Sequence, residues 1–248
     1  MQSVLNVHSG RKMRKTFSAV ILVACMLVFS ELARGEEVVQ LRPTDAYLSL
    51  FGGVALPFKT DTTESGLSNL TVNDVQLSNS ASIGGKAGVW FTAPRKILGL
   101  DLGVELDVTN FHPNQKAGQI LTTSTGGLVR TNAVDLMATF IGVNFLARLP
   151  MGVTPELPNG RWFPYVGIGG GVEGLRYDLG SAGGGAPSAG FQALGGAKVF
   201  LSKHIALFGE SKFTHASHTL KFQLAGGDLS DRLTLNTIHV AGGVSFHF

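Results

Sequence analysis

Cysteine is almost absent from this chain, since Cys25 is the single cysteine among 248 residues. A small fold stapled by disulfides is therefore excluded, because such folds depend on several cysteine pairs. The apolar run Phe17–Phe29 is also shorter than the roughly 20 residues that a membrane-crossing helix needs. Downstream of it, no stretch shows a convincing helical period of apolar residues. The sequence thus excludes a disulfide scaffold and argues against a helical membrane protein, with an uncleaved helical anchor over Phe17–Phe29 as the lesser alternative.

An excess of charge of one sign is missing as well, once the amino terminus is set aside. The whole chain has 20 basic and 17 acidic residues. Residues 1–35 hold five of the basic residues and one of the acidic ones, so 15 basic and 16 acidic residues remain, a net charge of about −1. The basic isoelectric point belongs to the amino terminus and gives no support for nucleic-acid binding.

The amino terminus has the form of a secretory signal peptide. A basic segment precedes the apolar run, and Ala33-Arg34-Gly35 supplies the small residues of a cleavage site. We expect residues 1–35 to be removed, with either Met1 or Met13 as the start. Leu22-Val-Ala-Cys25 also matches a lipoprotein signal, although the apolar run continues beyond Cys25, so lipidation stays an open alternative.

The carboxyl terminus alternates strictly between apolar and small or polar residues. From Ile238 to Phe248 every second residue is apolar or glycine, and those between include His239, Ser245 and His247. Side chains alternate across a strand, so one face of this segment is apolar up to the last residue. A soluble protein rarely ends on such an exposed strand, whereas a strand closing a barrel in a lipid bilayer has this pattern.

Strands of similar character recur along the chain. Most reach the roughly 9–11 residues with which a tilted strand crosses a bilayer. The eight predicted strands are Ala46–Leu56, Ser82–Thr92, Gly99–Phe111, Asp135–Leu149, Phe163–Tyr177, Gly190–Leu201, Ile205–His215 and Leu235–Phe248.

The predicted connections alternate in length. Long, polar connections are 57–81, 112–134, 178–189 and 216–234, and shorter ones are 93–98, 150–162 and 202–204. Outer-membrane barrels have long loops outside and short turns at the periplasmic side. We therefore predict an all-β protein, an eight-stranded antiparallel up-and-down transmembrane β-barrel over 46–248, preceded by the cleaved signal peptide and a short periplasmic segment, 36–45.

Charged residues fall on the face opposite the apolar one. The predicted luminal charge network is Lys86, Asp101, Glu105, Asp107, Arg148, Glu173, Lys198, Glu210 and Lys212, with Asn144 and Gln192 on the same face. A charge in the bilayer midplane costs a few kcal/mol, so we expect this face to line the lumen. An eight-stranded barrel is barely wide enough for its own side chains. The near balance of sign predicts a paired plug, and a narrow small-solute pore is the alternative.

Two further patterns have less specific meanings. Gly169-Gly-Gly-Val-Glu-Gly174 fits G-x-G-x-x-G but has no strand–helix context, so no dinucleotide site is expected. Aromatic residues near strand ends fit either interfacial girdles or ordinary sheet composition. They are Tyr47, Phe51, Trp90, Phe91, Phe111, Trp162, Phe163, Tyr165, Tyr177, Phe246 and Phe248.

Four segments carry a resemblance to a known family: Phe163–Gly169, Gly195–Ser202, Leu207–Thr214 and Val244–Phe248. With them, residues 46–248 resemble the small outer-membrane β-barrel domain family, which includes OmpA/OmpX-type and opacity-like surface proteins. The resemblance implies that Glu210 and Lys212 face the lumen and that Phe248 is the signal read by the barrel-assembly machinery. It does not fix the activity, because members serve as stabilising proteins, adhesins, pores or enzymes.

Two other functions need consideration. His215-Ala-Ser217 at the outer end of a strand resembles the lipid A deacylase barrels, but His218-Thr219 follows where that family has Asn and a small residue. A soluble lipocalin-type carrier would also have a signal peptide and alternating strands, with its apolar face turned inward.

We therefore expect a Gram-negative outer-membrane surface protein that is not an enzyme. It acts structurally or through its four long loops on an unknown extracellular partner. Outer-membrane lipid is its other partner. No cofactor, metal or nucleic acid is expected, because the scattered histidines show no ligand spacing.

Overall fold

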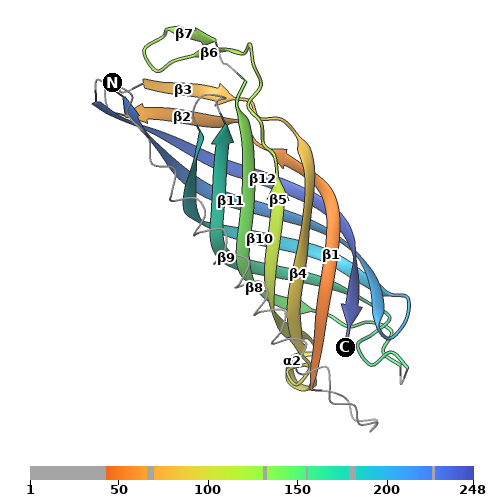
Figure 1. Ribbon diagram of the computed structural model, residues 1–248. Helices are drawn as coiled ribbons and strands as arrows, with labels where there is room; N and C mark the ends of the chain where they lie inside the picture. Colours follow the sequence, from red (N-terminus) through yellow and green to blue (C-terminus); the bar gives the residue numbers. More distant parts are fainter. Residues whose placement is uncertain (1–42, 66–69, 131–132, 155, 179–182, 225–226) are drawn as a thin grey trace, which may run out of the picture. The chain divides into compact units, whose positions relative to one another are not determined.

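The computed structural model describes residues 43–248 except 66–69, 131–132, 155, 179–182 and 225–226. The predicted signal peptide, with Cys25 and both possible start residues, lies outside the described residues. Eight strands close into an antiparallel barrel, which confirms the predicted fold class (Figure 1). Within the described part, no helix is long and apolar enough to cross a membrane.

The barrel strands pair in chain order around the wall. They are β1 (Thr44–Pro57), β4 (Ser80–Phe91), β5 (Asp101–Phe111), β8 (Asp135–Arg148), β9 (Trp162–Asp178), β10 (Gly183–Phe200), β11 (Ile205–Leu224) and β12 (Gly227–His247). Strand β12 pairs with β1, from His247 opposite Tyr47 to Thr237 opposite Pro57. This last pairing leaves no open edge in the wall. Closure is what a sheet in lipid requires, because no water is present there to bond unpaired backbone groups.

Smaller elements lie at the two ends of the barrel. Strands β2 (Thr60–Ser65) and β3 (Leu70–Val75) form a hairpin that pairs with β12, and β6 (Ile120–Thr122) and β7 (Leu128–Arg130) form a second hairpin. Figure 1 shows both hairpins at the same end of the barrel. The four-residue helix α2 (Arg95–Leu98) lies in the connection between β4 and β5, at the opposite end.

Two of the four predicted long loops are wrong. Most of 178–189 belongs to β10, and 216–234 is almost entirely the paired continuation of β11 and β12. The two segments are polar and rich in turn-forming residues, which is why the sequence predicts loops there. A strand that extends past the bilayer into water keeps its backbone pairing while its outer side chains become polar. The other two segments, 57–81 and 112–134, are connections that contain the short hairpins.

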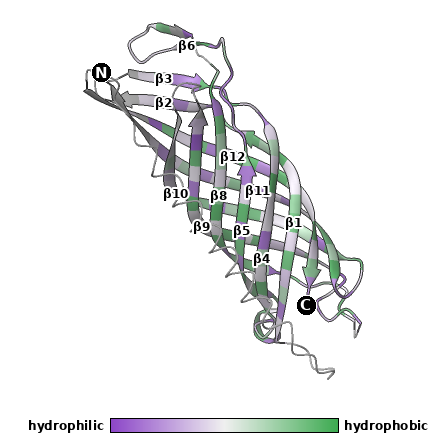
Figure 2. Cartoon of the chain, viewed as in Figure 1, coloured by the Kyte–Doolittle hydropathy of each residue, from purple (hydrophilic) through white to green (hydrophobic). Residues whose placement is uncertain are grey.

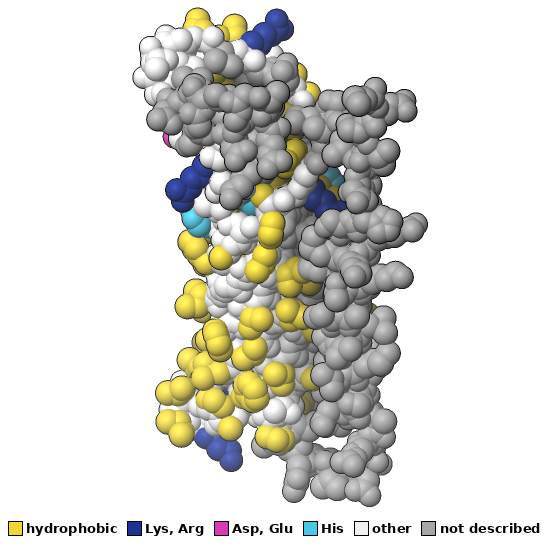
Figure 3. All heavy atoms as spheres, turned by 60° about the vertical axis from the view of Figure 1, so that its left-hand side comes forward, with side chains coloured by type: hydrophobic (Ala, Val, Ile, Leu, Met, Phe, Trp, Pro, Cys, Tyr) yellow, Lys and Arg dark blue, Asp and Glu magenta, His cyan; other side chains and the backbone are white. Residues whose placement is uncertain are grey.

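The alternation along each strand separates the two faces of the wall as predicted. On β1, Leu50 and Val54 are exposed while Ser49 and Phe51 are buried. On β12, Val240 and Phe246 are exposed while His239 and His247 are buried. Figure 3 shows hydrophobic side chains gathered over the outside of the barrel wall, and Figure 2 shows the alternation along the strands. Apolar residues face outward and polar residues face inward.

Most of the aromatic residues proposed for interfacial girdles are placed differently. Only Phe91, Trp162 and Phe246 are exposed on the outer face. Six others are buried in the lumen: Tyr47, Phe51, Trp90, Phe111, Phe163 and Tyr165. The interior of a small barrel needs large side chains to fill it, and rings on inward positions do so.

Glycine on inward positions makes room for these rings. A Cβ at Gly88 would lie 2.6 Å from the hydroxyl of Tyr47, and one at Gly103 would lie 2.7 Å from the indole of Trp90. Neither site leaves space for a side chain, so small and large inward residues alternate between neighbouring strands.

Candidate functional site: the barrel lumen

All nine residues of the predicted luminal charge network lie inside the barrel. Each is buried, and none is more than 6% exposed. They divide into three groups along the barrel: one at the end with the short turns, one in the middle and one toward the end with the hairpins. Buried charges are costly unless each finds an opposite charge or hydrogen-bond partners, so the contacts within each group decide what the lumen can do.

The middle group is built around Lys86. Its ammonium group lies 3.2 Å from Glu105 Oε1, 3.4 Å from Asp107 Oδ2 and 2.6 Å from Glu210 Oε2. Asp107 is the register partner of Lys86 on β5, whereas Glu210 reaches it from β11. One cation thus links three carboxylates on two separate parts of the wall.

Lys212 supplies the second cation of this group. Its Nζ donates to both oxygens of Asp107, at 3.0 and 2.8 Å, and to the hydroxyl of Thr109 at 2.6 Å. Two tyrosines add neutral donors: Tyr47 donates to Glu105 Oε2 at 2.6 Å and Tyr165 to Glu210 Oε2 at 2.9 Å. The carboxylates are therefore solvated by protein donors, which is what makes burial of several charges tolerable.

Arg148 organises the group at the short-turn end. Its guanidinium donates to Asp101 at 2.8 Å and to Asp45 at 2.7 Å. Its guanidinium also contacts two rings, 4.7 Å from the centre of Trp90 and 4.6 Å from that of Phe163, within cation–π range. These contacts hold one planar cation across β1, β5 and β8.

The same mouth of the barrel is tied to the turns below it. Arg95 of α2 donates to both oxygens of Asp101, at 2.7 and 2.5 Å, and to the carbonyl of Pro158 at 2.8 Å. His247 lies 2.8 Å from Asp45 through Nδ1. A chain of charged contacts therefore runs across this opening from α2 to the last strand.

Lys198 differs from the other luminal cations. Within the described residues no carboxylate lies within 4.0 Å of its ammonium group. It donates instead to Ser245 Oγ at 2.9 Å and sits 4.2 Å from the ring centre of Tyr47. The structure therefore places Lys198 among hydroxyl and aromatic partners and not in an ion pair.

Glu173 lies toward the hairpin end, apart from the other acids. Its Oε1 is 2.9 Å from Nε2 of His218, and Nδ1 of His218 is 2.8 Å from the carbonyl of Ala186. Both residues are fully buried. Because 216–234 was predicted to be a loop, the inward position of His218 was not predicted.

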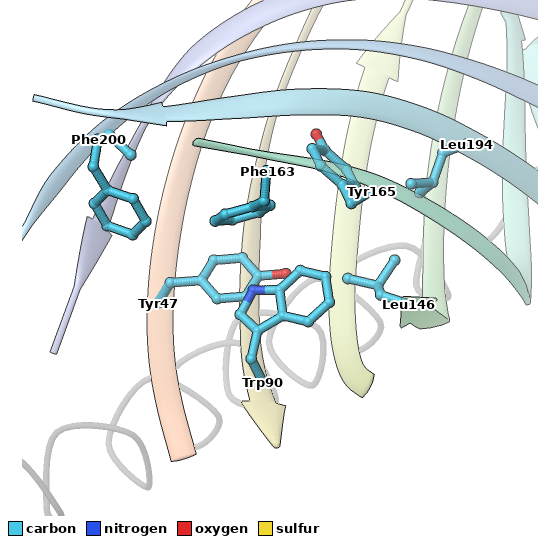
Figure 4. Packing of buried hydrophobic residues seen from close by; sticks show 8 residues of the cluster. Tyr47, Trp90, Leu146, Phe163, Tyr165, Leu194 and Phe200 are labelled. Carbon is cyan, nitrogen blue, oxygen red and sulfur yellow. The ribbon is translucent and has the colours of Figure 1, made fainter. Parts of the chain in front are cut away.

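An aromatic layer fills the lumen between the mouth and the middle group. Figure 4 shows Tyr47, Trp90, Phe163, Tyr165 and Phe200 pointing into the barrel, and they come from β1, β4, β9 and β10. The Trp90 and Phe163 rings are 5.8 Å apart in an edge-to-face arrangement, and those of Phe163 and Phe200 are 6.0 Å apart. Rings and ion pairs alternate along the lumen.

Sequence reasoning missed several members of this site. Asp45 was assigned to the segment before the barrel, yet β1 begins at Thr44 and Asp45 is buried at the mouth. Tyr47 and Tyr165 were considered as interfacial aromatics and in fact donate to luminal acids. The strand alternation could have found them. Extended by one residue it places Asp45 in the lumen, and applied to Tyr47 and Tyr165 it places both tyrosines there as well.

The H-x-S pair on β11 faces outward, as the alternation predicts. His215 Nδ1 lies 2.6 Å from Asn236 Oδ1, and Ser217 Oγ lies 2.7 Å from Thr234 Oγ1. Each side chain is thus engaged by β12, and the group that orients the imidazole is an amide where a hydrolytic triad has a carboxylate. Among the described residues, no group of three or more metal-binding side chains is arranged to hold a metal ion.

Phe248 is joined to the first barrel strand. Its backbone N–H donates to the carbonyl of Ala46 at 3.0 Å, and its side chain is half-buried. Along β12 it follows the outward series that includes Val244 and Phe246.

Comparison with known proteins finds likeness in structure alone. No protein-family model and no curated protein matches the sequence. The outer membrane protein OprG of Pseudomonas aeruginosa aligns with a TM-score of 0.50 at 13% identity, over 86% of this chain and 99% of OprG. Neisserial surface protein A gives 0.44 at 12% identity, over 82% and 97%. A major outer membrane protein of Thermus thermophilus gives 0.44 at 14%, over 82% and 99%. The chain has the fold of a small eight-stranded outer-membrane β-barrel.

Proposed function

We propose that this chain is an integral outer-membrane protein whose lumen is sealed and which acts structurally and through its outer hairpins. The observation that carries the proposal is the joint placement of charge and apolar surface. The luminal charge network is buried, and all of its members except Lys198 contact an opposite charge or a histidine inside the barrel, while many exposed side chains of the wall are apolar. Hydrocarbon tails can solvate this outer surface, as they do the apolar band of an outer-membrane barrel.

The extent of the apolar belt matches a bilayer. On β11 the outward series is apolar or small from Ile205 to Phe213 and turns polar at His215. On β12 the corresponding segment is Ile238–Phe246, and the outward residues that precede it, Thr234 and Asn236, are polar. Each segment fits the roughly 9–11 residues with which a tilted strand crosses the hydrocarbon core.

The filled lumen supports a scaffold and not a channel. A conducting path would have to part Lys86 from Glu210 and Arg148 from its aspartates, and would displace the aromatic layer as well. Charges buried in this way cost several kcal/mol each when their partners are removed. The lipocalin alternative required the opposite orientation, with apolar side chains inside.

The outer hairpins offer the surface for interaction. Strands β11 and β12 continue as a pair well beyond the apolar belt, and β12 pairs there with β2 as well. In the turn of the β6–β7 hairpin, the backbone N–H of Ser124 donates to the carbonyl of Thr71 on β3 at 2.9 Å. Exposed apolar side chains on this hairpin, Ile120 and Leu128, mark a position where an extracellular partner would bind. We infer that Phe248 is the assembly signal, as the family resemblance implies.

Surface labelling tests the location and orientation. If the signal peptide is cleaved after Gly35, the remaining chain has no cysteine, so one introduced cysteine reports one position. Ile120→Cys on the hairpin should react with a membrane-impermeant maleimide on intact cells. Ile97→Cys on α2, which is also exposed, should react only after the outer membrane is opened. Equal labelling of both in intact cells would contradict the proposal.

Planar-bilayer conductance tests the sealed lumen. The purified, inserted protein should give no steady current, because ion pairs and rings fill its interior. Heat-dependent migration of the same preparation on a gel serves as the control that the barrel is folded. A steady, ion-selective current would favour the narrow pore instead.

A further inference from the structure

Basic residues gather at the end of the barrel that carries the short turns. The three turn segments 92–100, 149–161 and 201–204 contain four basic residues and one acidic residue, Glu156. The segments at the hairpin end, 57–81, 112–135, 176–189 and 217–234, contain six basic and seven acidic residues. The two ends of one barrel thus differ in charge: the short-turn segments have a net charge of +3, and those at the hairpin end of −1.

Three of these four cations are free to bind something else. Arg95 is engaged by Asp101 and Pro158. Lys96, Arg161 and Lys203 are exposed, and within the described residues none of them has an acidic partner within 4.0 Å. They come from three different turns, β4–β5, β8–β9 and β10–β11, and are therefore distributed around most of the rim.

Each of these cations has exposed apolar neighbours. Lys96 precedes Ile97 and Leu98, Arg161 precedes Trp162, and Lys203 follows Leu201 after one residue. Ile97 is 88% exposed, the highest fraction of any large apolar side chain in the part of the chain that the structure describes. Figure 3 shows Lys and Arg side chains directly below the hydrophobic surface of the wall. A cation at the edge of an apolar belt lies at the depth of lipid headgroups.

We propose that Lys96, Arg161 and Lys203 form a basic collar that binds the phosphate groups of anionic phospholipids in the leaflet facing the short turns. The inference rests on the proposed function, because it needs the barrel to lie in a bilayer. Acyl chains of the same lipids would cover the neighbouring apolar residues, which a soluble anionic polymer would leave in water. The adjoining apolar surface therefore favours a lipid over a cell-wall polysaccharide as the occupant.

The two tryptophans make this collar measurable. Trp162 is exposed at the rim beside Arg161, whereas Trp90 is buried in the lumen. Phospholipids brominated near the glycerol end of their acyl chains quench tryptophan fluorescence by contact, so they report chiefly on Trp162. The full protein is reconstituted in phosphatidylcholine vesicles that contain either brominated phosphatidylglycerol or brominated phosphatidylcholine, and quenching gives the relative association of the two lipids with the rim.

We expect phosphatidylglycerol to be preferred roughly fivefold at low salt, about the effect of one well-placed cation near a membrane surface. The variant K96Q/R161Q/K203Q should reduce the preference to about one. The matched variant R130Q/R176Q/R232Q removes three cations at the hairpin end. It should keep the preference for phosphatidylglycerol at the short-turn rim. High salt should weaken the preference of the unaltered protein, because the exposed charges are screened.

The outcomes separate the two claims. Equal quenching by both lipids in the unaltered protein overturns the collar while leaving the barrel in its bilayer. The collar is also overturned if both triple variants lose the preference equally, or if purified peptidoglycan competes the anionic lipid away. If neither brominated lipid quenches Trp162, the proposed membrane location fails, and the collar fails with it.

Discussion

Lys86 and Glu210, 124 positions apart in the sequence, meet inside the barrel with 2.6 Å between the ammonium nitrogen and a carboxylate oxygen. They project from β4 and β11, which are not neighbours in the wall. The contact therefore bridges the lumen, and it can form only when the barrel is closed. Burial of both side chains makes each depend on the other.

Removing the cation from this contact should destabilise the barrel. In Lys86→Met, Glu105, Asp107 and Glu210 lose the ammonium group that they share, and we expect the free energy of unfolding to fall by about 3–5 kcal/mol. Urea unfolding in lipid vesicles, followed by tryptophan fluorescence, measures it. Lys59→Met is the control, because Lys59 is exposed and its pairing with Asp74 is 3.8 Å long.

A second substitution tests whether the loss is due to unpaired charge. Adding Glu210→Gln to Lys86→Met should recover part of the stability, since one of the orphaned carboxylates is then neutral. A Lys86→Met protein within about 1 kcal/mol of the original would contradict the buried-pair account, because loss of one partner normally costs more than that.

Adjacent glycines on β1 should differ sharply in their tolerance of alanine. The inward Gly53 leaves no room, since a Cβ there would meet the backbone of Val240 and Ala241 on β12. The outward Gly52 has nothing within 4 Å of an added Cβ. We expect Gly53→Ala to cost about 1–3 kcal/mol and to reduce the folded yield, because overpacked interiors strain the backbone. Gly52→Ala should be neutral or slightly stabilising. The urea concentrations at the unfolding midpoints of the two variants measure this difference. Equal midpoints would mean that β1 and β12 are spaced more loosely than described.

The outward H-x-S pair should have no hydrolytic role. The side chains of His215 and Ser217 are engaged by Asn236 and Thr234, and no carboxylate orients the imidazole within the described residues. Lipid A isolated from cells that produce the protein should keep its full set of acyl chains, as seen by mass spectrometry. Loss of an acyl chain that is restored by Ser217→Ala would show instead that the pair is catalytic.

Much of this arrangement could be predicted from the sequence because a strand has a single periodicity. Once Leu102 and Val104 were placed outside, Asp101 and Glu105 had to lie inside. The partners of each charge could not be predicted. Register places Lys86 opposite Asp107, but the reach of Glu210 across the lumen depends on strand tilt and closure.

The errors have physical reasons as well. Period-two alternation continues through Leu233 and Leu235, both buried, but the outer residues there are polar because they lie in water. Outer polarity alone was therefore a poor sign of a loop. Tyr47 and Tyr165 combine a ring with a hydroxyl, and composition does not say whether such a residue fills a lumen or lies at a membrane interface.

A charge placed on the wall should distinguish lipid from water around the barrel. Ile168 on β9 and Ile120 on β6 are almost equally exposed, at 69% and 71%, but only Ile168 lies in the apolar belt. In a bilayer Ile168→Arg should lower the free energy of unfolding by about 2–4 kcal/mol, because the charged guanidinium loses its hydration when it faces lipid near the midplane. Ile120→Arg should change it by less than about 0.5 kcal/mol, as at other exposed positions. Unfolding in phosphatidylcholine vesicles compares the two directly. Because the two positions match in side chain and exposure, the difference reports the surroundings of the belt, and two equally mild substitutions would place that belt in water.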